Sequence, residues 1–224
     1  MKIQAVIFDL AGTTVQDDNS VVKCLDDALR AGGYEVAFAE LNGRMGIPKP
    51  LAVRQVATGA SDEEIEAIHA DFQRRMIAFY RETPDVKEIE GASDTFRWLK
   101  SKGIKIGLDT GFDRATVEVL LNRLPWQGLI DASVTSDEVE RGRPHPDLIF
   151  EAMKRLGVSD VEAVAKVGDT PSDLGEGTSA GCGMVIGVWA GTHTQEQLSS
   201  YPHTHLIESV ADLPSLLERL DVLA

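Results

Sequence analysis

An aspartate stands at the end of the first apolar run in the chain. Residues 6–8 are apolar and lead into Asp9, and a turn with Gly12 and Thr13 follows soon after. Such a run is typical of a buried parallel strand, which delivers the next side chain to the carboxyl edge of a sheet. A carboxylate at that edge can act as a nucleophile. Ala11, two residues later, has no proton to donate, so a leaving group at this site needs help from elsewhere.

Three later segments also place polar residues where a strand is expected to end. They are Asp109-Thr110-Gly111, Arg141-Gly142-Arg143-Pro144 and Gly168-Asp169-Thr170-Pro171-Ser172-Asp173. Strand ends of a doubly wound sheet converge on one crevice. With Asp9, these segments supply a carboxylate nucleophile, a hydroxyl, a cation and an acid pair suited to Mg²⁺. A single aspartate after a strand is more often a helix cap, so the prediction depends on all four segments in this order.

The spacing of apolar residues from Gly91 onward predicts alternating helices and strands. The expected strands cover residues 104–109, 132–135, 164–167 and 184–188, with a last short strand from His205. The expected helices cover residues 92–102, 113–124, 146–156, 172–180 and 213–220. Together with the strand before Asp9, this alternation is that of an α/β fold with a doubly wound, Rossmann-like parallel sheet.

Between the first strand and this alternating region, the chain carries helical patterns and no strand signal. The expected helices are one that ends at Gly32-Gly33 and three more over residues 38–45, 50–57 and 61–81. Ser61 and Glu64 form a capping box at the start of the last one. We therefore predict two domains. An α/β core comprises residues 1–16 and 87–224, and a small all-helical cap domain comprises residues 17–86.

Composition narrows the classes of partner. The chain has 224 residues, of which 43% are hydrophobic, and a formal net charge of −14. This excess of negative charge argues against nucleic acids and anionic membranes as partners. We see no bilayer-spanning segment and no disulfide scaffold in the two cysteines, so we expect a cytoplasmic protein. An anionic substrate in so acidic a protein requires a metal ion or well-placed Lys and Arg side chains.

The motifs resemble those of the haloacid dehalogenase superfamily over essentially the full length, and the helical cap matches the cap inserted after the first motif in that superfamily. Within it, residues 9–14 and 142–144 are similar to those of phosphonoacetaldehyde hydrolases. Most phosphatases of the superfamily carry a second aspartate where Ala11 stands, and usually a lysine where Arg143 stands. Lys49 matches the cap lysine that forms an imine with the substrate aldehyde in those hydrolases.

The resemblance implies a Mg²⁺-dependent hydrolase that cleaves the carbon–phosphorus bond of a small phosphonate such as phosphonoacetaldehyde. It implies that Asp9 attacks phosphorus and that Lys49 forms the imine, while Thr110 and Arg143 hold the phosphoryl group. The implied metal ligands are Asp9, the carbonyl of Ala11, Asp169 and Asp173. The implied substrate contacts are Ala11, Gly12, Thr13, Met45, Gly46, Gly111 and Phe112. A homodimer through the cap is implied by the resemblance alone.

The role of Lys49 has two interpretations. Imine formation requires a neutral amine. Pro50 suits the first position of a helix, which places Lys49 at the positive end of that helix and disfavours the protonated form. A charged Lys49 would instead grip an anionic substrate, as lysines in Gly-x-x-Lys loops do in other caps, and the segment from Gly46 fits that pattern equally well.

The chain departs from the hydrolase pattern at several positions, including the prolines on both sides of Lys49. Ala52 stands where the hydrolases have a histidine, Phe112 where they have a tyrosine, and Asn19 near their hinge cysteine. Imine formation requires proton transfer, so without this histidine the sequence does not fix the identity of the substrate. One alternative is a phosphomonoesterase or phosphomutase in which Lys49 binds the substrate anion. Another is a non-catalytic sensor of phosphate-like ligands.

Overall fold

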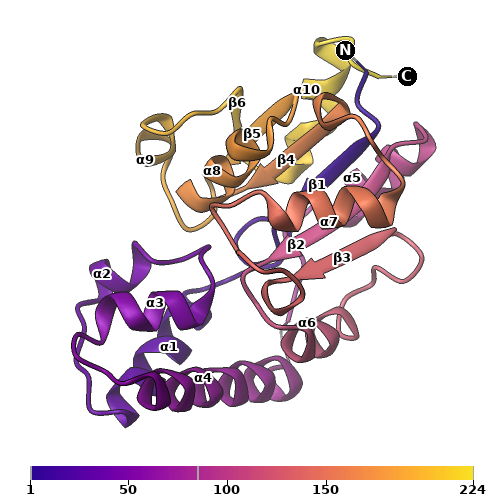
Figure 1. Cartoon of the computed structure of the whole chain (residues 1–224). Coiled ribbons are helices and arrows are strands. Elements are labelled where there is room, and N and C mark those ends of the chain that lie inside the picture. The colour runs from indigo at the N-terminus through magenta and orange to yellow at the C-terminus, as the bar shows by residue number, and fades with distance from the viewer. Residues whose placement is uncertain (1, 85, 224) are drawn as a thin grey trace.

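Six parallel strands form the centre of the molecule. The computed structural model describes residues 2–84 and 86–223, so residues 1, 85 and 224 of the two predicted domains lie outside it. The strand order is β3-β2-β1-β4-β5-β6 (Figure 1). The strands are β1 Ala5–Phe8, β2 Lys105–Thr110, β3 Ala132–Thr135, β4 Val164–Gly168, β5 Met184–Val188 and β6 His205–Ile207. The predicted α/β fold with a doubly wound parallel sheet is confirmed.

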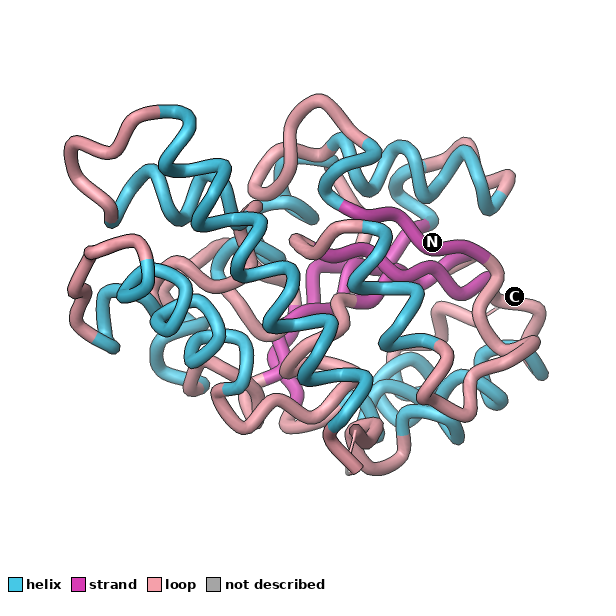
Figure 2. Tube along the Cα trace, turned by 90° about the horizontal axis from the view of Figure 1, so that it is seen from below, coloured by secondary structure: helices cyan, strands magenta, loops and turns pink. Residues whose placement is uncertain are grey.

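The register brings the predicted strand ends to one edge of the sheet. Phe8 pairs with Leu108 on one side and with Val167 on the other. The residues that follow, Asp9 and Asp109, therefore end neighbouring strands at the same level. β1 is buried along its whole length because helices cover both faces of the sheet (Figure 2), which explains its uninterrupted apolar sequence.

Helices and short turns fill the connections between the strands. The helices of this part are α5 Ala92–Ser101, α6 Arg114–Leu121, α7 Asp147–Leu156, α8 Pro171–Ala180, α9 Gln195–Ser199 and α10 Leu213–Arg219. Three 3₁₀ turns, η1 Ser136–Glu138, η2 Val161–Ala163 and η3 Val210–Asp212, precede α7, β4 and α10. α6 ends three residues before the predicted end at Leu124. α9 was not predicted, because five residues are too few to show a helical period.

A helical insertion lies between β1 and α5. It consists of α1 Ser20–Ala31, α2 Phe38–Asn42, α3 Lys49–Val56 and α4 Asp62–Glu82. The predicted capping box between Ser61 and Glu64 is present at the start of α4. The chain enters and leaves the insertion through two adjacent passages, where Val15 forms an antiparallel bridge with Glu88. The domain bounds at residues 16/17 and 86/87 remain a prediction.

Aromatic packing holds the insertion against the core at the end of β2. Phe112 follows β2, and its ring stacks on Phe72 of α4 at 6.4 Å between centroids. Tyr80, two turns further along α4, meets the same ring edge-on at 6.1 Å. All three side chains are buried. Because α3 packs on α4, the contact of α4 with Phe112 also brings α3 close to the carboxyl edge of the sheet. None of the helices in the described part of the chain is long and apolar enough to cross a membrane.

Candidate active site

A pocket opens between the carboxyl edge of the sheet and the helical insertion. The predicted site residues that line it are Asp9, Ala11, Met45, Gly46, Lys49, Thr110, Gly111, Phe112 and Arg143. Its remaining lining comes from Asp17, Val21, Thr170 and Thr192, which the sequence reasoning did not assign to the site. The other predicted residues, Gly12, Thr13, Asp169 and Asp173, lie buried behind this lining. The fold thus brings the four polar segments and the cap lysine together.

Asp9 follows β1 and is held in place on both sides. Its backbone N–H donates to the carbonyl of Val167 at 2.9 Å, which extends the sheet by one residue. Its Oδ1 accepts from Nη1 of Arg143 at 2.7 Å. Burial raises the pKa of Asp9 to about 7, Arg143 opposes this shift, and the nearby carboxylates Asp173 and Asp169 add to it. A further cation would therefore favour the ionised, nucleophilic form of Asp9.

Arg143 ties together acids from three separate parts of the fold. Its Nη1 lies 2.7 Å from Asp9 and 2.9 Å from Asp173, and its Nε donates to Glu176 at 2.9 Å. Its Nη2 donates to the backbone carbonyl of Asp109 at 2.9 Å and pairs with the carboxylate of that residue. Burial opposes its charge, but these carboxylates hold the pKa of Arg143 well above its usual range. Arg143 is therefore a fixed cation beside the nucleophile.

A second buried cation, Lys166, lies behind the first. It stands in the middle of β4, pairs with Asp109, and lies 3.2 Å from both Asp173 and Glu176. The sequence reasoning missed it, although a lysine inside the apolar strand 164–168 was a signal. Four carboxylates meet only two cations here, so negative charge remains in excess. Burial and the repulsion of Asp109 raise the pKa of Glu176 to about 8.

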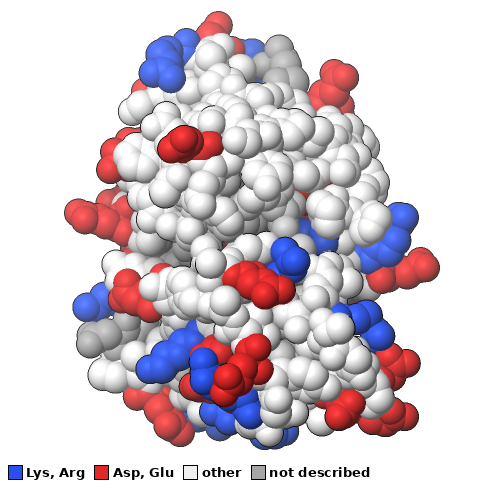
Figure 3. Space-filling view, turned by 90° about the vertical axis from the view of Figure 1, so that its left-hand side faces the viewer, with Lys and Arg blue, Asp and Glu red and all other residues white. Residues whose placement is uncertain are grey.

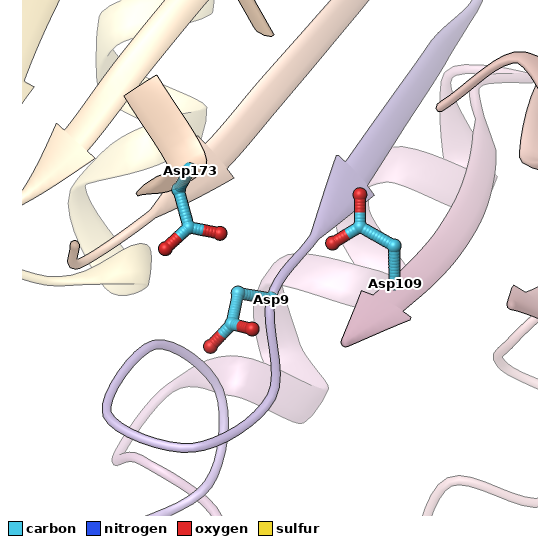
Figure 4. A group of neighbouring side chains, drawn as sticks. All are labelled: Asp9, Asp109 and Asp173. Atoms are coloured by element: carbon cyan, nitrogen blue, oxygen red, sulfur yellow. The ribbon is translucent and has the colours of Figure 1, made fainter. Parts of the chain in front are cut away.

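Three of these carboxylates converge on one another. Asp9, Asp109 and Asp173 each place an oxygen within 4.8 Å of the others (Figure 4), an arrangement consistent with a divalent metal site. Asp109 was not among the predicted ligands. Its carboxylate is also engaged by Arg143 and Lys166.

Asp169, a predicted ligand, lies outside this triad but close to it. Its Oδ1 accepts from the hydroxyl of Thr13 at 2.9 Å, and its Oδ2 from the backbone N–H of Thr192 at 2.7 Å. Gly12 packs so closely that a Cβ there would meet Asp169 Oδ2 at 2.3 Å. Burial, with a contribution from Asp173, raises the pKa of Asp169 to about 6. The excess of buried carboxylate near Asp9 fits a divalent cation.

Lys49 reaches the pocket from the opposite wall. It is the first residue of α3, after Pro48, rather than the residue before the helix as predicted. Only 4% of it is exposed, and its Nζ lies 6.0 Å and 5.9 Å from the ring centroids of Phe72 and Phe112. Its one protein hydrogen bond among the described residues is to the carbonyl of Ile47, at 3.4 Å. Burial lowers the pKa of Lys49 to about 8, although Asp9 opposes the shift.

The loop before Lys49 closes one side of the pocket. Gly46 has a φ of +84°, and a Cβ there would meet the Oγ1 of Thr170 at 2.3 Å. A Cβ at Gly111 would meet the carbonyl of Ile47 at 3.0 Å. The insertion therefore touches both core loops that flank the nucleophile. Thr110, which ends β2, lines the pocket beneath this loop, and its hydroxyl accepts from the N–H of Phe112.

Comparison with known proteins agrees with this geometry. The phosphonoacetaldehyde hydrolase of Bacillus cereus is 32% identical over 234 residues, covering 94% of this chain and 86% of that enzyme. That of Bacteroides fragilis is 29% identical over 231 residues, covering 95% and 87%. The fold matches a phosphonoacetaldehyde hydrolase-like protein from Oleispira antarctica with a TM-score of 0.88 at 23% identity, covering 99% of this chain and 93% of that one.

The family model of the haloacid dehalogenase-like hydrolases matches residues 6–187, which span the sheet from β1 to β5 and the whole insertion. The matched region contains Asp9, Lys49, Arg143 and the buried carboxylates. This chain belongs to the haloacid dehalogenase-like hydrolases and is related to phosphonoacetaldehyde hydrolases over its full length.

Proposed function

We propose that this protein is a Mg²⁺-dependent hydrolase that cleaves the carbon–phosphorus bond of a small phosphonate bearing an aldehyde, such as phosphonoacetaldehyde. The observation that carries the proposal is the arrangement of one pocket: Asp9 on one wall, Lys49 on the other, and no acid at residue 11. The relationship to phosphonoacetaldehyde hydrolases supports the choice of substrate.

A phosphonate is hard to cleave because its carbon leaves as a carbanion. An imine between Lys49 and the aldehyde changes this, since the electron pair of the carbon–phosphorus bond moves into the imine and forms an enamine. No proton donor is then needed where Ala11 stands. The enamine is later protonated on carbon, and water releases the aldehyde product and Lys49.

Asp9 supplies the electrons that replace the broken bond. One of its oxygens bonds to phosphorus as carbon departs, which gives an acyl phosphate that water hydrolyses to phosphate and free Asp9. Arg143 is placed to draw charge from the phosphoryl oxygens, and the hydroxyl of Thr110 can donate to them. Both groups are held before substrate arrives, so little reorganisation accompanies the reaction.

Asp9, the backbone carbonyl of Ala11, Asp169 and Asp173 would hold the metal ion. We favour Asp169 over Asp109 as a ligand, because Asp109 pairs with both Arg143 and Lys166, whereas the hydrogen-bond partners of Asp169 are the uncharged Thr13 and Thr192. A bound Mg²⁺ supplies charge stabilisation to the phosphoryl oxygens and keeps Asp9 ionised.

One experiment tests the proposal. The protein is incubated with Mg²⁺, phosphonoacetaldehyde and a borohydride reductant, phosphate release is measured, and peptides are examined by mass spectrometry. We expect phosphate release and a reduced adduct on Lys49. The Lys49→Arg variant keeps a cation but cannot form an imine, so it should give no adduct and no turnover. Full turnover by that variant would contradict the imine.

A phosphomonoesterase or phosphomutase is the second candidate. A pKa of about 8 leaves Lys49 mostly protonated at pH 7, which also suits a substrate-binding cation. Phosphate release from phosphomonoesters without any adduct would favour this candidate. Binding of phosphate-like ligands without turnover would favour a sensor. A cytoplasmic location and a homodimer through the insertion stay predictions.

A further inference from the structure

Asp17 is a pocket-lining carboxylate without a role in the proposed chemistry. It stands in the passage from β1 into the insertion, one residue after the bridge region of Val15 and Gln16, and lines the pocket together with Lys49. Asp18, the next residue, is exposed and does not line the pocket. Of these two neighbouring acids, only Asp17 can therefore contact a ligand in the pocket.

The turn after Asp17 holds one of its oxygens and leaves the other available. Oδ1 accepts from the hydroxyl of Ser20 and from the backbone N–H of Val21, at the start of α1. Among the residues that the structure describes, none donates to Oδ2. Asn19, between Asp17 and these donors, has a φ of +62°, a left-handed conformation that costs energy in a non-glycine residue. Because Asp17 lines the pocket, its Oδ2 is the oxygen available to a ligand there.

Imine formation requires a group that exchanges protons with Lys49 and with the substrate oxygen. The titratable side chains in the described lining of the pocket are Asp9, Asp17, Lys49 and Arg143. Asp9 is paired with Arg143 and engaged with phosphorus, and Arg143 does not lose its proton. His69 on α4 lies outside the pocket lining. Asp17 is left as the proton-exchange group.

We propose that Asp17 is the acid–base catalyst of imine formation at Lys49, replacing the histidine that the related hydrolases have where Ala52 stands. This inference rests on the proposed function. Asp17 takes a proton from the Lys49 ammonium, the free amine bonds to the aldehyde carbon, and a proton of the attacking nitrogen passes to the carbonyl oxygen. Asp17 then gives its proton to the departing hydroxyl, which leaves as water. The carboxylate is restored and the cationic imine remains, so charge and protons balance.

The alternative role of Asp17 is purely electrostatic, and it predicts the opposite result. Burial lowers the pKa of Lys49, and the negative charges of Asp9 and Asp17 oppose that shift. Removing the charge of Asp17 would lower the pKa further and give more neutral amine at pH 7. If Asp17 acted only through its charge, a neutral substitute would form the imine as fast as the native residue or faster.

The test is the rate of adduct formation in Asp17→Asn. Asparagine keeps an oxygen for Ser20 and Val21 but cannot exchange the proton. With phosphonoacetaldehyde, Mg²⁺ and cyanoborohydride at pH 7, we expect the rate of reduced adduct formation on Lys49 to fall about 10²-fold. Asp18→Asn, the matched control, should form it at the native rate. Asp17→Glu should recover part of the loss, which a merely structural role of the turn would not explain.

Adduct formation by Asp17→Asn at the native rate, or faster, would overturn the role of Asp17 while leaving the imine in place. Absence of the adduct from the native protein would instead overturn the proposed function, and the role of Asp17 with it. Unfolding midpoints of the variants, measured in the same buffer, separate a loss of fold from a loss of chemistry.

Discussion

Burial moves the two reactive groups toward their neutral forms. It raises the pKa of Asp9 to about 7 and lowers that of Lys49 to about 8. For Lys49 this shift favours nucleophilic attack, since only the free amine reacts with an aldehyde. For Asp9 it opposes attack, since only the carboxylate reacts with phosphorus. The site therefore needs an added cation near Asp9, where buried carboxylates are in excess, whereas burial beside the rings of Phe72 and Phe112 already favours the free amine of Lys49.

The pH dependence of adduct formation follows from the pKa of Lys49. The neutral amine is a small fraction below pH 8 and the major form above it. In Asp17→Asn, where no carboxylate takes the proton from Lys49, we expect the rate of Lys49 adduct formation with phosphonoacetaldehyde and cyanoborohydride to rise roughly tenfold per pH unit between pH 6 and 7.5, and to level off above about pH 8.5. Lys49→Arg should give no adduct at any pH. A flat profile from pH 6 to 9 in Asp17→Asn would mean that Lys49 is not the group that titrates.

At the scale of elements, the contact between the loop at Gly46 and the start of α8 at Thr170 places Lys49 opposite Asp9. We call this contact the seam. α8 begins with a capping box between Thr170 and Asp173, which also holds one of the buried carboxylates. The loop before α3 lies against this helix start at Gly46 and leaves no room for a side chain. One helix start therefore organises both the acid cluster and the position of the lysine loop.

A methyl group at the seam should move the pocket wall that carries Lys49 away from the wall that carries Asp9. Gly46→Ala introduces a Cβ at 2.3 Å from Thr170 Oγ1 and a strained φ of +84°, so the loop must move. We expect kcat/KM for phosphate release to fall roughly 10²-fold, and the free energy of unfolding to fall by about 1 kcal/mol or more.

The matched control for that variant is Gly43→Ala, three residues earlier. Gly43 has a φ of −66°, and a Cβ there would meet only backbone oxygens at 3.5 Å. Its unfolding free energy should stay within about 0.5 kcal/mol of the native value. Equal kinetics for the two variants, measured by steady-state phosphate release, would show that the seam does not control the pocket.

At the scale of the whole molecule, the protein has an excess of negative charge overall and a second excess among the buried groups of the site. The net charge is −14, yet Lys and Arg are interspersed with Asp and Glu on the lower part of the face in Figure 3, where the insertion lies. Inside, the carboxylates around Arg143 and Lys166 outnumber the cations. This buried excess should make the stability of the whole fold depend on pH and on divalent cations.

A carboxyl whose pKa is raised by folding contributes stability at low pH and loses it as pH rises through the raised value. The ordinary carboxyl pKa of 3.8 and the raised values, about 6 for Asp169 and about 7 for Asp9, place that loss between about pH 4 and 7. We expect the metal-free protein, measured by denaturant unfolding in EDTA, to lose this contribution over that range. Mg²⁺ at 100 times its Kd should add about 2.7 kcal/mol at pH 8.

Asp169→Asn tests whether Asp169 contributes to the pH-dependent loss of stability and to the stabilisation by Mg²⁺. It should reduce both the pH-dependent loss and the stabilisation by Mg²⁺, because it removes one buried negative charge and one proposed ligand. Asp94→Asn, at an exposed position on α5, should change neither. An unchanged Mg²⁺ effect in Asp169→Asn would exclude that residue from the metal site.

The sequence alone determined the class of fold, the order of its elements and the residues of the reactive segments. These features are local, because period, caps and turns are set by residues a few positions apart. Asp9 and Arg143 could be named as site residues for this reason, and the capping box at Ser61 and Glu64 could be placed. Lys49 could be named only from the resemblance of its segment to the cap of the phosphonoacetaldehyde hydrolases.

Only the tertiary structure decided how the charges are paired and shifted. Arg143 meets Asp9 across 134 positions of the chain, and Lys166 meets Asp109 across 57. Such pairs depend on strand order and register, which no local pattern encodes. Asp17 lines the same pocket as Lys49 only in the folded chain, and the pKa shifts arise from burial that exists only after the insertion packs on the core.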